Sequence, residues 1–246
     1  MAALHWGQTA PDPDTLMLHC TLARHESLLP LARAAGLRAV LPDLLGHGRS
    51  PAWDGQGDYQ TANLDAILPM MDRPMHVIGH SFGGTVALRL AVTRPDLVTR
   101  LTLIEPVFFA LANGTPAGAQ HAAIFGPIYD AVAAGDPDRA AQLFHAAYGM
   151  GQWDKLPQRT RMAMAAGMPL VIASAPAIQD DIHGVAARLP EITVPVTLIG
   201  GSDSQPVVTE IHKALAQIMP QANAHVIAGA GHMATLTHPD RVAALI

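Results

Sequence analysis

The chain has little cysteine, few aromatic side chains and few charged ones. Of its 246 residues, one is cysteine, 4% are aromatic and 14% are charged. The single cysteine, Cys20, cannot form a disulfide within the chain, which is typical of proteins in a reducing compartment. Because half of the residues are hydrophobic, the composition excludes a disordered protein, which needs low hydrophobicity and high charge.

Basic clusters, metal-binding spacings and long apolar runs are missing too. The net charge is −5 and Lys and Arg form no cluster, so nucleic acid is not an expected partner. The 13 histidines follow no metal-site spacing, and we expect neither a metal nor a cofactor. No run of roughly 18 apolar residues predicts a membrane span, and residues 1–7 lack the pattern of a signal peptide. These absences predict a cytoplasmic protein.

Short apolar runs of β type alternate with helical patterns through most of the chain. This alternation is typical of α/β proteins, in which helices cover both faces of a mostly parallel sheet, and the length suits one such domain. Strands are expected at Thr15–His19, Leu37–Leu41, Met75–Ile78, Leu101–Ile104, Val194–Ile199 and Ala224–Ile227, with an edge strand at Ala3–Trp6. Helices are expected at Glu26–Ala35, Asn63–Met71, Phe82–Thr93 and Thr209–Ile218.

The alternation breaks between residues 107 and 190, where helical patterns occur without a clear strand. Gly135-Asp136-Pro137 combines a residue that ends one helix, a residue that caps the next, and a proline suited to its first turn. Further glycines and prolines, as in Gly167-Met168-Pro169, predict four or five short helices. We expect residues 107–190 to form a lid over the strand ends of a core made of residues 1–106 and 191–246.

The segment Gly79-His80-Ser81-Phe82-Gly83 lies between an expected strand and an expected helix. A serine between two glycines at such a corner is the arrangement that exposes a hydroxyl as a nucleophile. The tight turn leaves no room for side chains at Gly79 and Gly83, and the amides that begin the helix can stabilise negative charge. Ser81 is therefore the predicted nucleophile.

A serine hydroxyl becomes reactive when a base takes its proton, and the base must itself be oriented by an acid. His232 lies in a loop of small residues after the last expected strand and is the predicted base. Two carboxylates, Asp203 and Glu105, follow strands between Ser81 and His232 and could present an oxygen to it. We prefer Asp203 as the acid and keep Glu105 as the alternative.

Negative charge that develops on a substrate oxygen needs two backbone N–H donors, which form an oxyanion hole. Phe82 directly follows the predicted nucleophile and is expected to provide one of them. The second is expected from the loop after the strand Thr15–His19, at Thr21 or Leu22. We select Thr21.

Together these motifs resemble the α/β-hydrolase family over nearly the whole chain. The matching segments are an oxyanion motif at His19-Cys20-Thr21, the loop after the family's fourth strand at 42–50, a nucleophile elbow at 79–83, an acid loop at Gly200-Gly201-Ser202-Asp203 and a histidine loop at Gly231-His232. The resemblance implies a Ser81-His232-Asp203 triad and a helical cap at 107–190. Cys20 departs from the pattern, because the family usually has glycine there, and Glu105 stands where some members place the acid.

Residues 107–190 carry many Phe, Tyr, Trp and Met side chains, which predict an apolar cleft that adapts to varied shapes. The predicted function is hydrolysis of small carboxylic esters with an apolar acyl or aryl part, through an acyl-enzyme. Alternatives with the same triad are carbon–carbon bond hydrolysis and acyl transfer, and a further alternative is a ligand-binding receptor. Apolar lid surface could also pack against a second copy of the chain, so a homo-oligomer stays open.

Overall fold

A computed structural model describes residues 3–246. Seven strands form one sheet in the order β1-β3-β2-β4-β5-β6-β7. The edge strand β1 is antiparallel to β3, and every other neighbouring pair is parallel. The strands are β1 (Trp6–Gln8), β2 (Thr15–Leu18), β3 (Ala39–Pro42), β4 (Met75–His80), β5 (Val98–Ile104), β6 (Val196–Gly201) and β7 (Ala222–Ile227).

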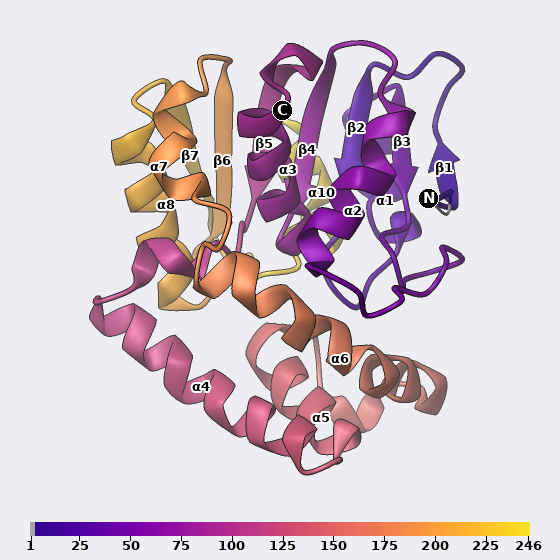
Figure 1. The fold of residues 1–246 in the computed structure, drawn as a ribbon, viewed down its shortest axis with the longest axis vertical. Helices are drawn as coiled ribbons and strands as arrows, with labels where there is room; N and C mark the ends of the chain where they lie inside the picture. Colours follow the sequence, from indigo (N-terminus) through magenta and orange to yellow (C-terminus); the bar gives the residue numbers. More distant parts are fainter. Residues whose placement is uncertain (1–2) are drawn as a thin grey trace.

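Helices cover both faces of the sheet (Figure 1). α2, α3 and α8 pack on one face, whereas α1, α9 and α10 pack on the other. The α-helices are α1 (Leu29–Ala34), α2 (Tyr59–Ile67), α3 (Phe82–Thr93), α4 (Pro116–Ala133), α5 (Pro137–Tyr148), α6 (Gln158–Gln179), α7 (Val185–Arg188), α8 (Pro206–Ile218), α9 (Ala234–Thr237) and α10 (Pro239–Ala243). The predicted α/β architecture is therefore confirmed.

The inner strands, β2 to β6, are largely apolar runs because both of their faces are mostly buried. Successive side chains of a strand point to opposite faces. In β4, Val77 packs into the core under α3 and Ile78 packs into the core under α1. The expected strands all form within a few residues of their predicted bounds, and α3 has the predicted bounds. The edge strand lies at Trp6–Gln8 and not at Ala3–Trp6.

Between β5 and β6 the structure consists of helices and loops, and we refer to α4, α5 and α6 with their connections as the cap. Figure 1 shows the cap across one end of the sheet. Gly135 has the left-handed φ of +74° predicted for a helix end. Asp136 accepts a hydrogen bond from the Arg139 N–H, and Pro137 is the first residue of α5. The segment 107–190 is thus helical as expected, while its treatment as a separate domain stays a prediction.

The cap helices are longer than predicted. α4 has 18 residues and α6 has 22, and Gly167-Met168-Pro169 lies inside α6. A proline inside a helix removes one backbone hydrogen bond and costs about 3 kcal/mol. Packing of α6 against α5, α2 and α4 offsets that cost. By length and composition alone α6 could also cross a membrane, a test that core helices of soluble proteins pass as well, and a third of the relevant window is buried in this fold.

Candidate active site

Ser81 lies at the corner between β4 and α3. Its φ of 57° and ψ of −121° are strained for a residue with a side chain, and such strain is often found where a reactive group must be held in place. A Cβ atom on Gly79 would collide with the backbone of Gly83, and one on Gly83 would collide with the carbonyl of Leu18. The absence of room at the two glycines is therefore confirmed, and close packing constrains the turn that carries Ser81, whose side chain is buried beneath the cap.

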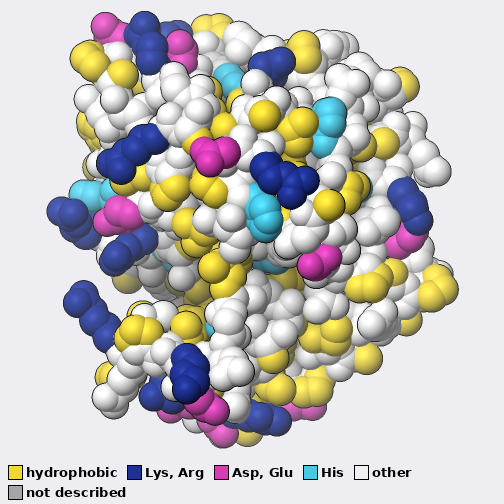
Figure 2. Space-filling model, turned by 180° about the vertical axis from the view of Figure 1, so that it is seen from behind, with side chains coloured by type: hydrophobic (Ala, Val, Ile, Leu, Met, Phe, Trp, Pro, Cys, Tyr) yellow, Lys and Arg dark blue, Asp and Glu magenta, His cyan; other side chains and the backbone are white. Residues whose placement is uncertain are grey.

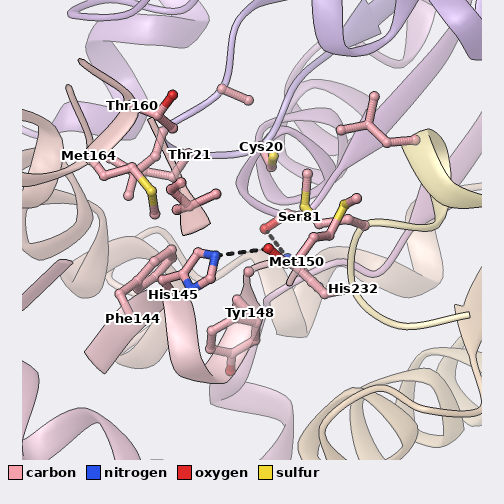
Figure 3. Close-up of a pocket in the computed structure, with 16 residues that line it drawn as sticks. Cys20, Thr21, Ser81, Phe144, His145, Tyr148, Met150, Thr160, Met164 and His232 are labelled. Carbon is pink, nitrogen blue, oxygen red and sulfur yellow. Dashed lines mark hydrogen bonds between the residues drawn. The ribbon is translucent and has the colours of Figure 1, made fainter. Parts of the chain in front are cut away.

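His232 lies against Ser81, as predicted. Its Nε2 is 2.9 Å from the Ser81 Oγ, although the two residues are 151 positions apart in the chain. Figure 3 shows the two side chains together at the base of a pocket. The Nε2–H of His80 donates to the His232 carbonyl at 2.8 Å, and burial lowers the pKa of His80 to about 3. A neutral His80 thus fixes the backbone of the loop that carries His232.

Glu105 is the carboxylate that contacts His232. It directly follows β5, has a φ of +50° and is fully buried. Its Oε2 lies 3.2 Å from His232 Nδ1, and its Oε1 accepts hydrogen bonds from the Gly201 N–H at 2.7 Å and the Ser204 hydroxyl at 2.8 Å. Burial alone would raise the pKa of Glu105, but His232 and these donors hold it below its ordinary value. The group is therefore suited to remain an anion beside the imidazole.

The preference for Asp203 is contradicted by this geometry. Asp203 is exposed, and its carboxylate accepts a hydrogen bond from the Ser202 hydroxyl at 2.8 Å. Its backbone N–H donates to the Ala230 carbonyl at 2.9 Å, which ties the two loops together. Gly201 at the end of β6 and Ser204 in the following loop donate their amide and hydroxyl to Glu105. The segment that contains Asp203 was expected to supply the acid. Instead, it donates hydrogen bonds to Glu105, which follows the neighbouring strand β5.

Phe82 and Thr21 both lie beside Ser81 with amides available for an oxyanion. Within residues 3–246, neither amide has a hydrogen-bond acceptor in the protein. Leu22, the alternative to Thr21, donates its N–H to His47 Nε2 at 2.9 Å. Since that amide is occupied, the geometry favours Thr21 over Leu22, and the hole itself stays a prediction.

The loop at Cys20 does not require the glycine that the family pattern has at this position. The positive φ of 62° falls on Leu22 and not on Cys20. His19 bonds to the Cys20 carbonyl through Nδ1 at 2.7 Å and accepts the Leu44 N–H at Nε2. Burial raises the pKa of the Cys20 thiol to about 12, which favours its protonated form.

Two cavities meet at Ser81. A cavity of about 290 Å³ lies under the cap, and one of about 30 Å³ lies deeper. The predicted lid side chains that line one or both are Phe109, Phe125, Phe144, Tyr148, Met150 and Met164. Others do not line them, among them Met162, which is 61% exposed on the surface. The walls are mainly apolar, as the composition of the lid predicted.

Tyr148 links the cap to His232. The two rings meet edge to face with centroids 4.9 Å apart, and the Tyr148 hydroxyl bonds to His121 Nδ1 at 3.0 Å. Burial and the nearby Glu105 charge raise the pKa of Tyr148, and burial lowers that of His121 to about 4. The pair is therefore neutral. Sequence reasoning missed His121, whose only signal is its place four residues before Phe125 on α4.

One group outside the cavities, His5, His25 and Asp43, brings three potential metal-ligand atoms within 4.8 Å of one another. The carboxylate of Asp43 bonds instead to both imidazoles and to the backbone N–H groups of His25 and Arg49. These donors hold the pKa of Asp43 at about 2, against the effect of burial. The cluster therefore acts as a hydrogen-bonded anchor between the loops after β2 and β3.

The fold and the Ser81, His232 and Glu105 contacts define a serine hydrolase of the α/β type. The chain belongs to the Alpha/beta hydrolase family, whose profile matches residues 15–245. It is 32% identical over 95% of its length, and over 96% of the relative's, to a pimeloyl-[acyl-carrier protein] methyl ester esterase of Aromatoleum aromaticum. A match to the lipase LipV of Mycobacterium tuberculosis is 44% identical but covers only 35% of this chain and 30% of that protein.

Solved structures show the same fold. An esterase from Exiguobacterium antarcticum superposes with a TM-score of 0.77 and 18% identity, covering 98% of this chain and 92% of that one. At such identity the likeness concerns the fold. With the family established, the chain is an α/β-hydrolase enzyme of the esterase-like kind. The cytoplasmic location stays a prediction.

Proposed function

We propose that this chain hydrolyses carboxylic esters with Ser81 as nucleophile, His232 as general base and Glu105 as the acid that orients it. The observation that carries the proposal is the continuous contact from Ser81 Oγ to His232 Nε2 and from His232 Nδ1 to Glu105 Oε2. Nucleophile, base and orienting acid in hydrogen-bond reach are what covalent catalysis by serine requires.

In the first half-reaction, Ser81 Oγ forms a bond to the ester carbonyl carbon while His232 Nε2 takes the serine proton. The amides of Phe82 and Thr21 stabilise the oxyanion of the tetrahedral intermediate. The carbon–alkoxide bond then breaks and His232 returns its proton to the departing alcohol, which leaves an acyl-Ser81 ester. Glu105, an anion with a lowered pKa, stabilises the transient imidazolium.

In the second half-reaction, His232 takes a proton from water as the water oxygen bonds to the acyl carbon. The bond to Ser81 Oγ breaks, and the proton on His232 returns to the serine. Each turnover consumes one ester and one water and yields one acid and one alcohol. No metal or cofactor is required for these steps, and the apolar cavity walls favour apolar ester groups.

A second candidate is a methyl ester whose acyl group is attached to a carrier protein. Two observations favour it. One is the nearly full-length likeness to an esterase with such a name. The other is that the exposed residues Arg24, Lys155 and Arg159 directly adjoin the cavity-lining residues Ala23, Leu156 and Thr160. Figure 2 shows basic side chains on both sides of the notch between core and cap, where a negatively charged carrier could bind.

A fluorophosphonate probe tests the proposed nucleophile, because it forms a covalent bond only with an activated hydroxyl. We expect one adduct, mapped to the peptide that contains Ser81, and its loss in Ser81→Ala. Ser27→Ala is the matched control and should keep full labelling, since Ser27 lies outside both cavities. Turnover of an aryl ester by Ser81→Ala should fall by several orders of magnitude. Labelling of the folded variant at another residue would refute the assignment.

Product analysis separates ester hydrolysis from the alternatives that share this site. Acid and alcohol in equal amounts, unchanged when an acceptor alcohol is added, support hydrolysis. A new ester in the presence of the acceptor supports acyl transfer. Binding of ligand without product release supports a receptor.

A further inference from the structure

The two cavities at Ser81 differ about tenfold in volume, about 290 Å³ against about 30 Å³. Both are lined by the same five residues around the reacting hydroxyl, namely Thr21, Ser81, Phe144, Tyr148 and His232. An ester has two arms, and each must extend from the carbonyl into space on one side of the serine. The large cavity gives one arm of the ester ample space, and the small cavity gives the other arm little.

The large cavity has solvent-exposed residues among its walls, whereas most walls of the small one are buried residues. The walls of the large cavity include Met150, which is 43% exposed, and Leu236, which is 36% exposed. The other walls of the small cavity are all buried: Val107, Phe109, Phe125, Val171, Ser174 and Ile178. The small cavity therefore lies deeper in the fold than the large one.

A third cavity adjoins the small one. It measures about 290 Å³, and Phe109 and Phe125 line both it and the small cavity. The two phenyl rings have centroids 6.0 Å apart and are packed beside His121. The Phe109–Phe125 pair therefore forms the partition between the small cavity and the third cavity.

The order of the chemical steps assigns the arms of the ester. After the first half-reaction the acyl group remains bonded to Ser81, while the alcohol must leave and water must enter from the same side. Exchange of alcohol for water needs the cavity whose walls reach the surface, whereas the retained acyl group can occupy the one with buried walls. The acyl arm therefore belongs in the small cavity, and the alcohol arm belongs in the large one.

We propose that this hydrolase selects esters of very short acids with larger apolar alcohols, and that Phe109 and Phe125 set the limit on acyl length. The proposal rests on ester hydrolysis at Ser81, and it is incompatible with the second candidate above, a methyl ester with a carrier-bound acyl group, in which the small arm is the alcohol. A cavity of 30 Å³ has room for about two water-sized groups, so acetyl and propionyl fit and longer chains meet the two rings. Each methylene that does not fit costs about 1–3 kcal/mol, or roughly 10- to 200-fold in kcat/KM.

The experiment measures kcat/KM for p-nitrophenyl acetate, propionate, butyrate, hexanoate and octanoate with the unmodified protein. We expect a fall of at least about 100-fold from propionate to hexanoate. Methyl octanoate, which has the arms reversed, should be a poor substrate. Hydrolysis of octanoate as fast as acetate, or a preference for methyl octanoate, would overturn the proposal. Failure of every ester together with failure of the fluorophosphonate adduct would instead refute the proposed function.

Variants of the partition test the role of the two rings. Phe125→Ala should join the small and third cavities and raise the hexanoate-to-acetate ratio at least about tenfold. Phe125→Leu, a smaller change less disturbing to the cap, should raise it in the same direction. Leu156→Ala adds space to the large cavity and should leave the acyl ratio unchanged. An unchanged ratio in folded Phe125 variants, checked by circular dichroism, would exclude these rings as the limit.

Discussion

The end of the sheet and the cap face each other across Ser81, but they are built differently. The sheet end is dense in polar contacts: Glu105 accepts from three groups, and buried histidines hold the loops that carry His232 and Thr21. The cap presents mainly apolar walls, with Tyr148 and His121 as its polar pair near His232. From this difference we infer that the sheet end holds the reactive groups, and that the cap determines the shape of the space above them.

The sharpest test of the sheet end compares the two carboxylates. Glu105→Gln keeps the side-chain size but removes the charge that stabilises the imidazolium, and we expect kcat to fall about 10³- to 10⁴-fold. Asp203→Asn alters a surface hydrogen bond, so its kcat should stay within about threefold. Steady-state kinetics on an aryl acetate measures both. A large loss in Asp203→Asn with little loss in Glu105→Gln would reverse the assignment.

Local patterns were enough to predict most of this sheet end. The strands were predictable because buried parallel strands are continuous apolar runs. Ser81 was predictable because it lies between two glycines after a strand, and His232 because it follows small residues in a loop after another strand. The acid was not, because Glu105 and Asp203 both follow strands. The choice between them depends on the direction in which the end of β6 and the loop after it turn their hydrogen-bond donors, and no short pattern encodes that direction.

The cap was less predictable from the same signals. Gly135-Asp136-Pro137 predicted a helix boundary correctly, because the capping contacts involve adjacent residues. The local sequence at Pro169 predicts a helix end, but Pro169 lies inside α6. Its cost inside α6 is offset by packing against helices distant in the sequence, and propensity alone does not include that packing. The partition of Phe109 and Phe125 depends on the same tertiary arrangement.

Low pH should reduce the free energy of unfolding, because the sheet end contains buried neutral histidines. Burial, with a smaller contribution from neighbouring histidines, lowers the pKa of His19 and His80 to about 3. Their unfolded pKa is about 6.5, so the unfolded state binds more protons below that pH. The free energy of unfolding should therefore fall as the pH drops from about 6.5 towards 3, by about 2 kcal/mol for each group at pH 5.

Urea unfolding between pH 7.5 and pH 4.5 measures this decline. His80→Gln keeps a side-chain N–H donor but cannot take up a proton, and it should make the curve less steep. His238→Gln is the matched control, since His238 bonds only at the surface, and it should leave the slope unchanged. A wild-type free energy of unfolding that is flat over this range would show that these histidines are not held neutral.

Glycine substitutions compare how tightly the two regions are packed. A Cβ atom on Gly83 would collide with backbone atoms of Leu18 and His19, whereas one on Gly126, inside α4, would meet nothing within 4 Å. Gly83→Ala should destabilise the protein by about 3 kcal/mol or more, because backbone cannot move aside as a side chain can. Gly126→Ala should stabilise it by up to about 1 kcal/mol through helix propensity. Thermal unfolding measures both, and equal effects would show that the turn at Ser81 is not constrained by packing.

Tyr148→Phe tests the boundary between the two regions, because this cap residue contacts His232. The variant keeps the ring against the imidazole and removes only the hydroxyl that bonds to His121. We expect a loss of about 1 kcal/mol in stability, since a buried His121 nitrogen loses its partner, and a change in kcat below about fivefold. A loss in kcat near 100-fold at unchanged KM would mean that the hydroxyl acts on the reacting atoms. Chemistry would then extend into the cap, and the division between reactive sheet end and shaping cap would fail.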